Sequence, residues 1–317
     1  YLLLQQGYEV VAIDNLTTGY KQPLELLQKK FGEKQFRYYT QNLLEDLTPF
    51  FEKEKNIKAV LHFAASCIVD ESVAHPEKYF TNNTCASQHL FETLIKQGIR
   101  NVIFSSTCAV YGDVNYIPVD EKHPVNPMSP YGASKQLTEE LLQWYGKTKK
   151  LNYVILRYFN VCGAADDGVF GDSKKPSSLL VQNAVRGVLG IEPFMLTCAE
   201  VDTPDKTPIR DYINVIDLVE AHVKALEHLM NGGANEIINL GTGTGNSVLE
   251  IVTAVEHITG KSIERKTGEA RRGEMPKVIA DTTKAEKVLG WKAKRTIQDS
   301  VNSLITWYKN HPNGWEY

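Results

Sequence analysis

The sequence has 317 residues, which at roughly 150 residues per domain corresponds to about two domains and is long enough to bury a core without disulfides or metal ions. With 42% hydrophobic residues, 23% charged residues and a formal net charge of -3, its composition excludes disordered and fibrous proteins and argues against nucleic acid as the main partner. No apolar run approaches the ~20 residues of a membrane-spanning helix, and residues 1–20 lack a signal-peptide pattern, so we expect a cytoplasmic protein with no membrane partner.

Apolar strand patterns alternate with amphipathic helical patterns along the chain. Buried strands are expected at 10–13, 60–63, 102–105, 153–156 and 236–240, and helices at 77–97, 131–149, 217–230 and 247–259. This alternation predicts an α/β fold with a doubly wound, Rossmann-like parallel sheet. The polar segment 163–209, with one helix near 179–189, predicts a smaller substrate lobe. The predicted domains are 1–160 for dinucleotide binding, with 211–243 returning to it, and 161–210 with 244–317 for substrate binding.

The first residues are unusual for such a fold. Tyr1–Gly7 resembles the end of a helix, and the strand that follows it ends at Asp14. In a dinucleotide-binding unit, the acid that binds the ribose lies ~20 residues after the glycine-rich turn. We therefore expect that the strand and glycine loop of the unit precede residue 1 and that the natural protein is longer.

Tyr131 and Lys135 form the sharpest local signal. They follow Pro130, a residue suited to open a helix, and their i, i+4 spacing places both side chains on one helical face. A nearby ammonium favours the phenolate form, so Tyr131 can act as a proton shuttle. An isolated pair of this kind is usually an ordinary surface pair. Thr107, at the end of the strand preceding this helix, makes the catalytic interpretation stronger because ligands bind at strand carboxyl ends in such sheets.

Other signals point away from metal and phosphate chemistry. The cysteines lack a CxxC pair and predict reduced thiols rather than a disulfide framework or zinc site. The acids at 166–172 lack calcium-loop spacing. The glycine loop at 241–245 lacks a P-loop lysine and predicts a turn before a helix capped by Ser247 and Glu250. His62, ending a strand, is more simply a buried strand histidine than a ligand.

Several motifs occur together in a fixed order: HFAASCIVDESV at 62–73, SSTCAVYG at 105–112, YGASK at 131–135, LRYFNVCGA at 156–164, TPDKTPIRDYI at 203–213, NLGTGTGNSV ending at Val248, and RRGEMP at 271–276. On these motifs the chain resembles, over essentially its whole length, the extended short-chain dehydrogenase/reductase family, and within it the UDP-hexose 4-epimerases. The resemblance implies an NAD-dependent isomerase that interconverts UDP-glucose and UDP-galactose by transient oxidation at sugar C4. It also implies a homodimer.

The resemblance also implies roles for individual residues. The catalytic residues would be Tyr131, Lys135 and Thr107. Asp14 would bind the adenosine ribose and disfavour NADP, and Asn42 would border adenine, although the family often has Asp there. Cofactor-binding residues would be Asp14, Asn15, Leu16, Thr17, Thr18, Gly19, Asn42, Leu43, Phe63, Ala64, Ala65, Ser66, Cys67, Asn82, Thr107, Tyr131, Lys135 and Phe159. Substrate-binding residues would be Thr107, Tyr131, Asn160, Ser178, Leu179, Arg210, Arg271 and Glu274.

Some positions depart from the family pattern. Ser178 replaces the family's Asn or His, Thr197 stands where an aromatic ring often packs on uracil, and Lys206 replaces the glycine of a turn. Val278 is intermediate in size at a position that limits space beside sugar C2, so a UDP-GlcNAc/UDP-GalNAc or other UDP-sugar 4-epimerase is an alternative. A nucleotide-sugar dehydratase is less favoured because Cys108 and Ala109 follow Thr107 where dehydratases carry acids. A non-catalytic UDP-sugar-binding paralogue is a further alternative.

Overall fold

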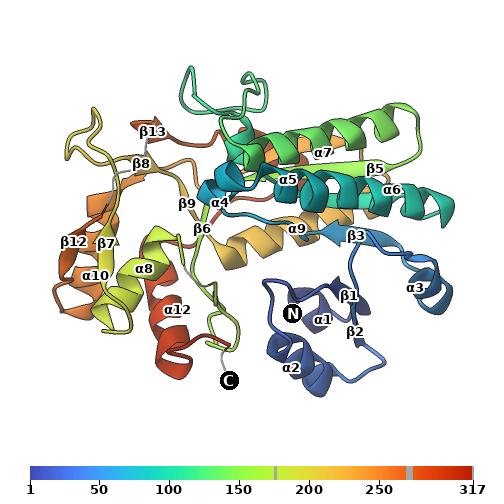
Figure 1. The fold of residues 1–317 in the computed structure, drawn as a ribbon, viewed down its shortest axis with the longest axis horizontal. Coiled ribbons are helices and arrows are strands. Elements are labelled where there is room, and N and C mark those ends of the chain that lie inside the picture. The colour runs from blue at the N-terminus through green and yellow to red at the C-terminus, as the bar shows by residue number, and fades with distance from the viewer. Residues whose placement is uncertain (175–176, 269–273, 316–317) are drawn as a thin grey trace. The chain divides into compact units, whose positions relative to one another are not determined.

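The computed structural model describes residues 1–174, 177–268 and 274–315, and the chain divides into two compact units (Figure 1). Unit 1 comprises residues 1–113, 124–157 and 222–238, and unit 2 comprises 114–123, 158–221 and 239–317. Unit 2 thus includes residues 114–123 and 158–160 of the predicted NAD-binding domain. Within the predicted returning segment 211–243, residues 222–238 belong to unit 1.

Parallel strands form the framework of unit 1. Strands β1 (Val10–Asp14) and β2 (Phe36–Thr40) pair in parallel, as do β3 (Ala59–His62) and β4 (Asn101–Thr107). A four-stranded sheet has the order β10-β5-β4-β3, with β5 at Asn152–Tyr158 and β10 at Glu236–Leu240. These strands confirm the five predicted strand positions and the α/β class. The pair β1–β2 shows that Phe36–Thr40 is a further strand, which the sequence reasoning did not predict.

Helices follow these strands, as the predicted alternation requires. Helices α6 (Ala86–Lys96) and α7 (Pro130–Lys147) run side by side on one face of the four-stranded sheet (Figure 1). The predicted helix 77–97 is divided into α5 (Pro76–Tyr79), a π-helix (Phe80–Cys85) and α6. The remaining helices with residues in unit 1 are α1 (Leu2–Gln5), α2 (Gln22–Phe31), α3 (Thr48–Lys53), α4 (Val69–Ala74), a 3₁₀ turn (Cys108–Val110) and α9 (Val215–Met230).

The start of α7 is specified locally. Ser129 has extended backbone geometry, and its hydroxyl accepts a hydrogen bond from the backbone N–H of Gly132 at 3.2 Å. Pro130 occupies the first helical turn, where its missing N–H costs nothing. On the inner side of the helix, Leu142 packs into a core with residues of β4, β5 and α6 such as Phe104, Ile155 and Phe91. Cap and core together fix which face of α7 meets the sheet.

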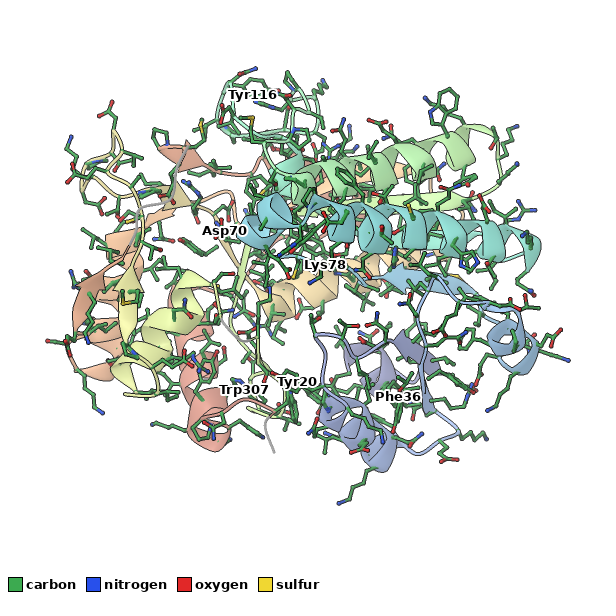
Figure 2. All side chains as sticks on the ribbon, in the orientation of Figure 1. Tyr20, Phe36, Asp70, Lys78, Tyr116 and Trp307 are labelled. Atoms are coloured by element: carbon green, nitrogen blue, oxygen red, sulfur yellow. The ribbon has the colours of Figure 1, made fainter. Side chains whose placement is uncertain are left out.

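Unit 2 has its own core around three helices. Helices α8 (Leu180–Val188), α10 (Val248–Thr259) and α12 (Ile297–Asn310) pack against one another, and Trp307 of α12 is fully buried among them (Figure 2). Its other elements are β6 (Asn160–Cys162), β7 (Phe194–Leu196), β8 (Ile209–Arg210), β9 (Tyr212–Asn214), β11 (Asn246–Ser247), β12 (Arg265–Thr267), β13 (Lys277–Val278) and α11 (Thr283–Leu289).

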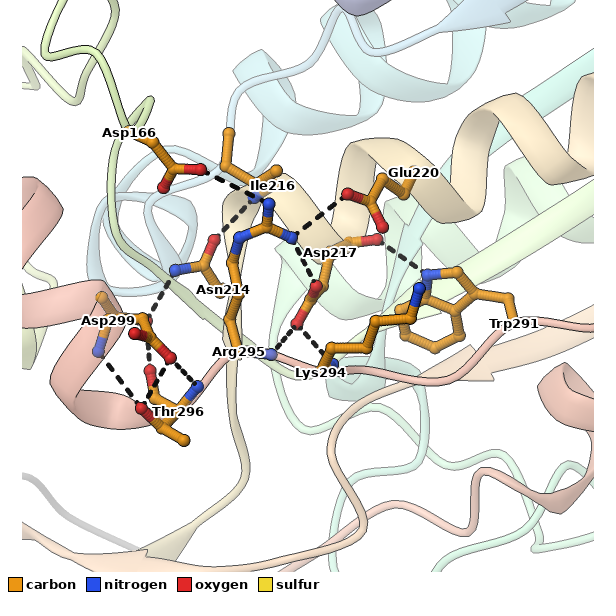
Figure 3. Close-up of polar contacts among 11 residues, drawn as sticks. Asp166, Asn214, Ile216, Asp217, Glu220, Trp291, Lys294, Arg295, Thr296 and Asp299 are labelled. Atoms are coloured by element: carbon orange, nitrogen blue, oxygen red, sulfur yellow. Dashed lines mark hydrogen bonds and ion pairs between the residues drawn. The ribbon is translucent and has the colours of Figure 1, made fainter.

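A buried carboxylate holds the C-terminal part of unit 2 in place. Asp217, in the first turn of α9, accepts hydrogen bonds from the backbone N–H groups of Lys294 and Arg295 and from the Arg295 guanidinium, at 2.8–2.9 Å (Figure 3). The indole of Trp291 donates to the Asp217 carbonyl at 3.0 Å. Residues 291–295 are thereby tied to α9, immediately before α12 begins.

The glycine loop at 241–245 surrounds a carboxylate of this chain. The backbone N–H groups of Thr242 and Gly243 donate to the buried Asp211 carboxylate at 2.8 and 3.0 Å. A Cβ on Gly241 would lie 2.6 Å from an Asp211 oxygen, which explains the glycine at that position. The predicted capping box is confirmed, with Ser247 and Glu250 exchanging hydrogen bonds at the start of α10. The glycine loop therefore has a structural partner inside the protein.

Within the ranges that the structure describes, no helix has both the length and the apolar character needed to cross a lipid bilayer.

Candidate active site

Thr107, Tyr131 and Lys135 come together in unit 1 where β4 ends. Thr107 is the last residue of β4, and its hydroxyl accepts a hydrogen bond from the backbone N–H of Ala109 at 3.1 Å. The side chains of Thr107 and Tyr131 are also hydrogen-bonded to each other. Lys135 follows one turn later on α7 and is only 3% exposed, with its ammonium 4.8 Å from the centroid of the Phe104 ring. A hydroxyl, a phenol and an amine thus form one cluster.

Burial acts on both titratable groups of this cluster. It raises the pKa of Tyr131 well above its usual range, while the hydrogen bond from Thr107 lowers that pKa. Burial lowers the pKa of Lys135 to about 8, against the opposing effects of Cys67 and Glu139. A phenol and an amine with shifted pKa values in one cluster are typical of an acid–base site.

A short loop after β3 lies near the cluster, since Cys67 at its end affects the pKa of both Tyr131 and Lys135. Residues 63–67 contain Phe63, which is 52% exposed and whose ring centroid lies 4.9 Å from that of His222. Ala64 and Cys67 are exposed, whereas Ala65 and Ser66 are half-buried. The half-buried Asn82 donates from its amide to the Ser66 hydroxyl at 3.2 Å. The small side chains of this loop leave its backbone open to close approach by a ligand.

Asn83 fixes this loop, and the sequence reasoning did not assign it a role. Its amide oxygen accepts from the backbone N–H of Ser66 at 2.8 Å, and its amide nitrogen donates to the Ser66 carbonyl at 2.9 Å and to the Ser134 hydroxyl at 3.0 Å. Asn83 is buried in the π-helix, so no water replaces these bonds. The signal available in the sequence was an Asn-Asn pair inside a helical stretch, where Asn is a poor helix former.

His62 is a buried strand histidine, as the simpler interpretation of the sequence predicted. Its Nε2 is 2.7 Å from the Ser87 hydroxyl, and its ring packs against Phe91 and Phe104. Burial and the nearby Lys135 ammonium lower the pKa of His62 to about 3, so the ring is neutral at physiological pH. A neutral, hydrogen-bonded ring in the core contributes to packing below the site.

The end of β1 forms a tight, exposed turn. The Asp14 carboxylate accepts from the backbone N–H of Leu16 at 2.7 Å, and the Asn15 side chain accepts from Thr17 at 3.0 Å. A Cβ on Gly19 would lie 3.4 Å from either Asp14 oxygen, so the backbone of Gly19 passes close to this carboxylate. The exposed Thr18 completes the turn. The carboxylate remains open to solvent and to a ligand.

Asn42 and Leu43 follow β2 and are half-buried. The Asn42 side chain accepts from the backbone N–H of Leu44 at 2.9 Å, and the Leu43 carbonyl accepts from the His89 ring at 2.6 Å. Because β1 and β2 are parallel neighbours, this segment and the Asp14 turn lie at the same edge of their sheet.

Unit 2 contains a separate pocket. It is lined by polar and apolar residues from β6, α8, β7, β8 and the segment before β13, and it includes five of the predicted substrate-binding residues: Asn160, Ser178, Leu179, Arg210 and Glu274. Thr197 and Cys198 also line it. Phe159 lies in unit 2 as well, where it is buried and its N–H donates to the Leu240 carbonyl. Arg271 lies outside the described residues.

Arg210 and Glu274 join the segments that border this pocket. The Arg210 guanidinium donates to the Met275 carbonyl at 2.8 Å, and Glu274 accepts from the backbone N–H of Ala199 at 2.8 Å. The two charged groups are 3.9 Å apart. Lys206, in the preceding turn, has φ of 64°, a left-handed conformation that favours glycine. A fixed cation beside a polar pocket can bind an anionic ligand.

Comparisons with known proteins agree with these features. The model of the family described as NAD dependent epimerase/dehydratase matches residues 1–241. The UDP-glucose 4-epimerase of Lactobacillus helveticus is 35% identical over 317 residues, covering 99% of this chain and 94% of that protein. The crystal structure of UDP-glucose 4-epimerase from Bifidobacterium longum in complex with NAD⁺ and UDP is 35% identical, with a TM-score of 0.92 and coverage of 99% of this chain and 95% of that one.

A third similar protein is named for two sugar nucleotides. The UDP-Glc/GlcNAc 4-epimerase from Campylobacter jejuni is 33% identical to this chain, with a TM-score of 0.82 and coverage of 98% of this chain and 94% of that one. The family match spans most of the chain, and the relatives extend over nearly all of it. The chain therefore belongs to the NAD dependent epimerase/dehydratase family.

Proposed function

We propose that this protein is an NAD-dependent UDP-hexose 4-epimerase that interconverts UDP-glucose and UDP-galactose. The observation that carries the proposal is the cluster of Thr107, Tyr131 and Lys135 at the carboxyl end of β4, in a member of this family. The similar proteins named above support the choice of UDP-hexoses as substrates.

The residues of unit 1 fit NAD. The exposed Asp14 carboxylate has acceptor positions left for ribose hydroxyls, and its charge disfavours the 2′-phosphate of NADP. The small residues of the 63–67 loop allow the backbone to approach a pyrophosphate. Asn82, Asn42, Leu43 and the 15–19 turn are proposed to contact the cofactor as well, as is Phe159 of unit 2. Bound NAD would accept hydride from sugar C4 and return it to the opposite face.

The residues of the chain supply the proton chemistry. Tyr131 Oη takes the proton of the sugar O4 hydroxyl and later returns it, while Thr107 Oγ1 orients that hydroxyl. Burial raises the pKa of Tyr131, and the Thr107 hydrogen bond lowers it. Lys135, one helical turn away on α7, places a cation near the phenol, and a nearby cation favours the phenolate form. Neither group needs to leave the cluster, so the same pair serves both half-reactions.

The pocket of unit 2 is proposed to bind the UDP group. Arg210, together with Arg271, would neutralise the diphosphate, while Asn160, Ser178, Leu179 and Glu274 would contact the rest of the nucleotide-sugar. Inversion at C4 requires the sugar to present both faces. Strong contacts to UDP with weak contacts to the hexose would allow this rotation. The Campylobacter jejuni relative and the intermediate size of Val278 make UDP-GlcNAc and UDP-GalNAc the second substrate pair to assay.

The test is interconversion of UDP-galactose and UDP-glucose by the purified protein with NAD, followed by product separation. We expect turnover without net NADH, and Tyr131→Phe should reduce kcat at least ~100-fold because it removes the proton shuttle. Tyr145→Phe is the matched control, since it removes a phenol hydroxyl from the same helix away from the cluster and should retain activity. NADH formed in equal amount to product would reject the proposal.

Two further expectations belong to this proposal. The family resemblance favours a homodimer, and light scattering coupled to size-exclusion chromatography measures its mass directly. The same resemblance favours a cytoplasmic location, which fractionation of cells expressing the natural gene would test.

A further inference from the structure

A buried charged group extends the row of functional residues on α7. Glu139 follows Tyr131 and Lys135 at the same i+4 spacing, so all three lie along one face of the helix. Its carboxylate is 1% exposed. It accepts a hydrogen bond from the Ser106 hydroxyl at 2.5 Å and two from the Arg157 guanidinium, at 3.0 and 2.5 Å. The proposed proton chemistry does not itself use Glu139.

These bonds connect the two elements that build the cluster, α7 and β4, with each other and with the neighbouring strand β5. Ser106 directly precedes Thr107 on β4, and Arg157 lies on β5 with its guanidinium 4.8 Å from the centroid of the Tyr111 ring. Glu139 therefore attaches α7 to the end of β4 and to its neighbouring strand. The positions of Tyr131 and Thr107 relative to each other depend on this attachment.

Stability alone does not explain the charges. Removing two charges from water is costly, and apolar side chains of similar size often stabilise a core equally well. What apolar side chains cannot supply is a negative charge one helical turn from the buried Lys135. The identity of Glu139 is thus better explained by its effect on its neighbours.

We propose that Glu139 is a positioning residue: held by Ser106 and Arg157, its carboxylate keeps the Lys135 amine charged and keeps α7 aligned with the end of β4. The inference rests on the proposed function for its catalytic meaning. The predicted effect of Glu139 on the pKa of Lys135 does not depend on the proposed function and can be measured without enzyme turnover.

The groups around Lys135 determine how its pKa should change when the charge of Glu139 is removed. On α7 these are Tyr131 and Glu139; the loop after β3 contributes Cys67; β3 contributes His62, which is neutral; and Arg157 of β5 lies behind Glu139. Burial lowers the pKa of Lys135 to about 8, and Glu139 and Cys67 oppose this effect. Loss of the Glu139 charge leaves burial less opposed, so the amine should lose its proton at lower pH.

The experiment uses Glu139→Gln, which keeps the size of the side chain and one acceptor oxygen but removes its charge. The titration of Lys135 is followed by NMR of protein carrying lysine labelled with ¹³C at the ε carbon, and the resonance is assigned by its loss in Lys135→Arg. We expect the midpoint to fall by about one pH unit. The alkaline limb of the epimerase pH profile should move by the same amount.

The matched control is Glu140→Gln, which removes the same charge from the next residue of the same helix. Glu140 is exposed, and it accepts a hydrogen bond from the Gln136 amide of the same helix at 3.0 Å, so water screens its charge. Its substitution should leave the Lys135 midpoint and the pH profile unchanged. An equal shift in both variants would overturn the inference, because the effect would then not depend on the buried carboxylate.

A second variant is needed in case Glu139→Gln does not fold, because that substitution leaves the buried Arg157 charge without its carboxylate partner. Glu139→Leu combined with Arg157→Met replaces the pair by apolar side chains and should fold. If Glu139 acts through its charge, the Lys135 midpoint still falls in the double variant. If the pair is only structural, the midpoint and pH profile return to wild type and the inference fails. Lack of epimerase activity in the wild type, with the midpoint shift present, would refute the proposed function only.

Discussion

Replacing Asn83 by Leu tests whether the loop after β3 is held by a single side chain. Leu keeps the branched shape of the Asn side chain, although it is larger, and has none of its polar atoms, so the variant loses the three hydrogen bonds to Ser66 and Ser134 at 2.8–3.0 Å. The site is buried, and each net hydrogen bond contributes about 1 kcal/mol. The free energy of unfolding should therefore fall by about 3 kcal/mol.

The functional consequence is larger disorder of residues 63–67. If this loop binds the pyrophosphate, the cofactor should dissociate at least ~10-fold more readily, since a flexible loop must be ordered again on binding. Urea denaturation measures the loss of stability, and NAD retained per protein after gel filtration measures the loss of binding. Asn302→Leu, at an exposed position of α12, is the control and should change neither quantity. Wild-type stability in Asn83→Leu would refute the assignment of Asn83 as the residue that holds the loop.

Two other substitutions test local physical arguments. Burial lowers the pKa of His62 to about 3, whereas a histidine in the unfolded chain titrates near ~6.5. Between these two pH values the unfolded chain binds one more proton than the folded protein. The free energy of unfolding therefore decreases as the pH falls through this interval, by at most about 5 kcal/mol. His62→Gln removes this titration, so urea denaturation between pH 7 and 4 should show a shallower acid limb; curves parallel to wild type would contradict the argument. Lys206→Gly relieves the strain of the left-handed backbone at φ of 64° and should raise the free energy of unfolding by about 0.5–1 kcal/mol. Lys287→Gly, inside α11, is the control and should lower the free energy of unfolding by a similar amount. A destabilised Lys206→Gly protein would show that the turn is not strained.

Local pattern was sufficient for much of the fold. The apolar runs at 102–105 and 236–240 predicted β4 and β10, and the spacing of Ser247 and Glu250 predicted the start of α10. These features depend on neighbours within a few residues, because helix caps and strand periodicity are short-range. The division of the predicted helix 77–97 by a π-helix was missed; in the structure Asn83 of the π-helix bonds to Ser66 and Ser134, which lie outside this stretch of the chain.

The pocket of unit 2 was anticipated only through family resemblance. Arg210 and Glu274 are 64 positions apart, and composition or periodicity gives no reason to place them together. The structure brings them within 3.9 Å, and both bond to backbone groups of the segments that border the pocket. The substrate assays with UDP-hexoses test their proposed role in binding UDP.

The sequence by itself determined the α/β alternation, the family, and the i, i+4 row that places Tyr131 and Lys135 on one face of α7, because each follows from residue types at short, regular spacing. Tertiary structure alone decided what other elements bring to those side chains: the Thr107 hydroxyl, the Arg157 guanidinium that holds the Glu139 carboxylate, and a loop held by Asn83. The physical reason is that the pKa of a buried amine or phenol depends on charges and hydrogen bonds from strands far away in the chain, which spacing along one helix does not encode.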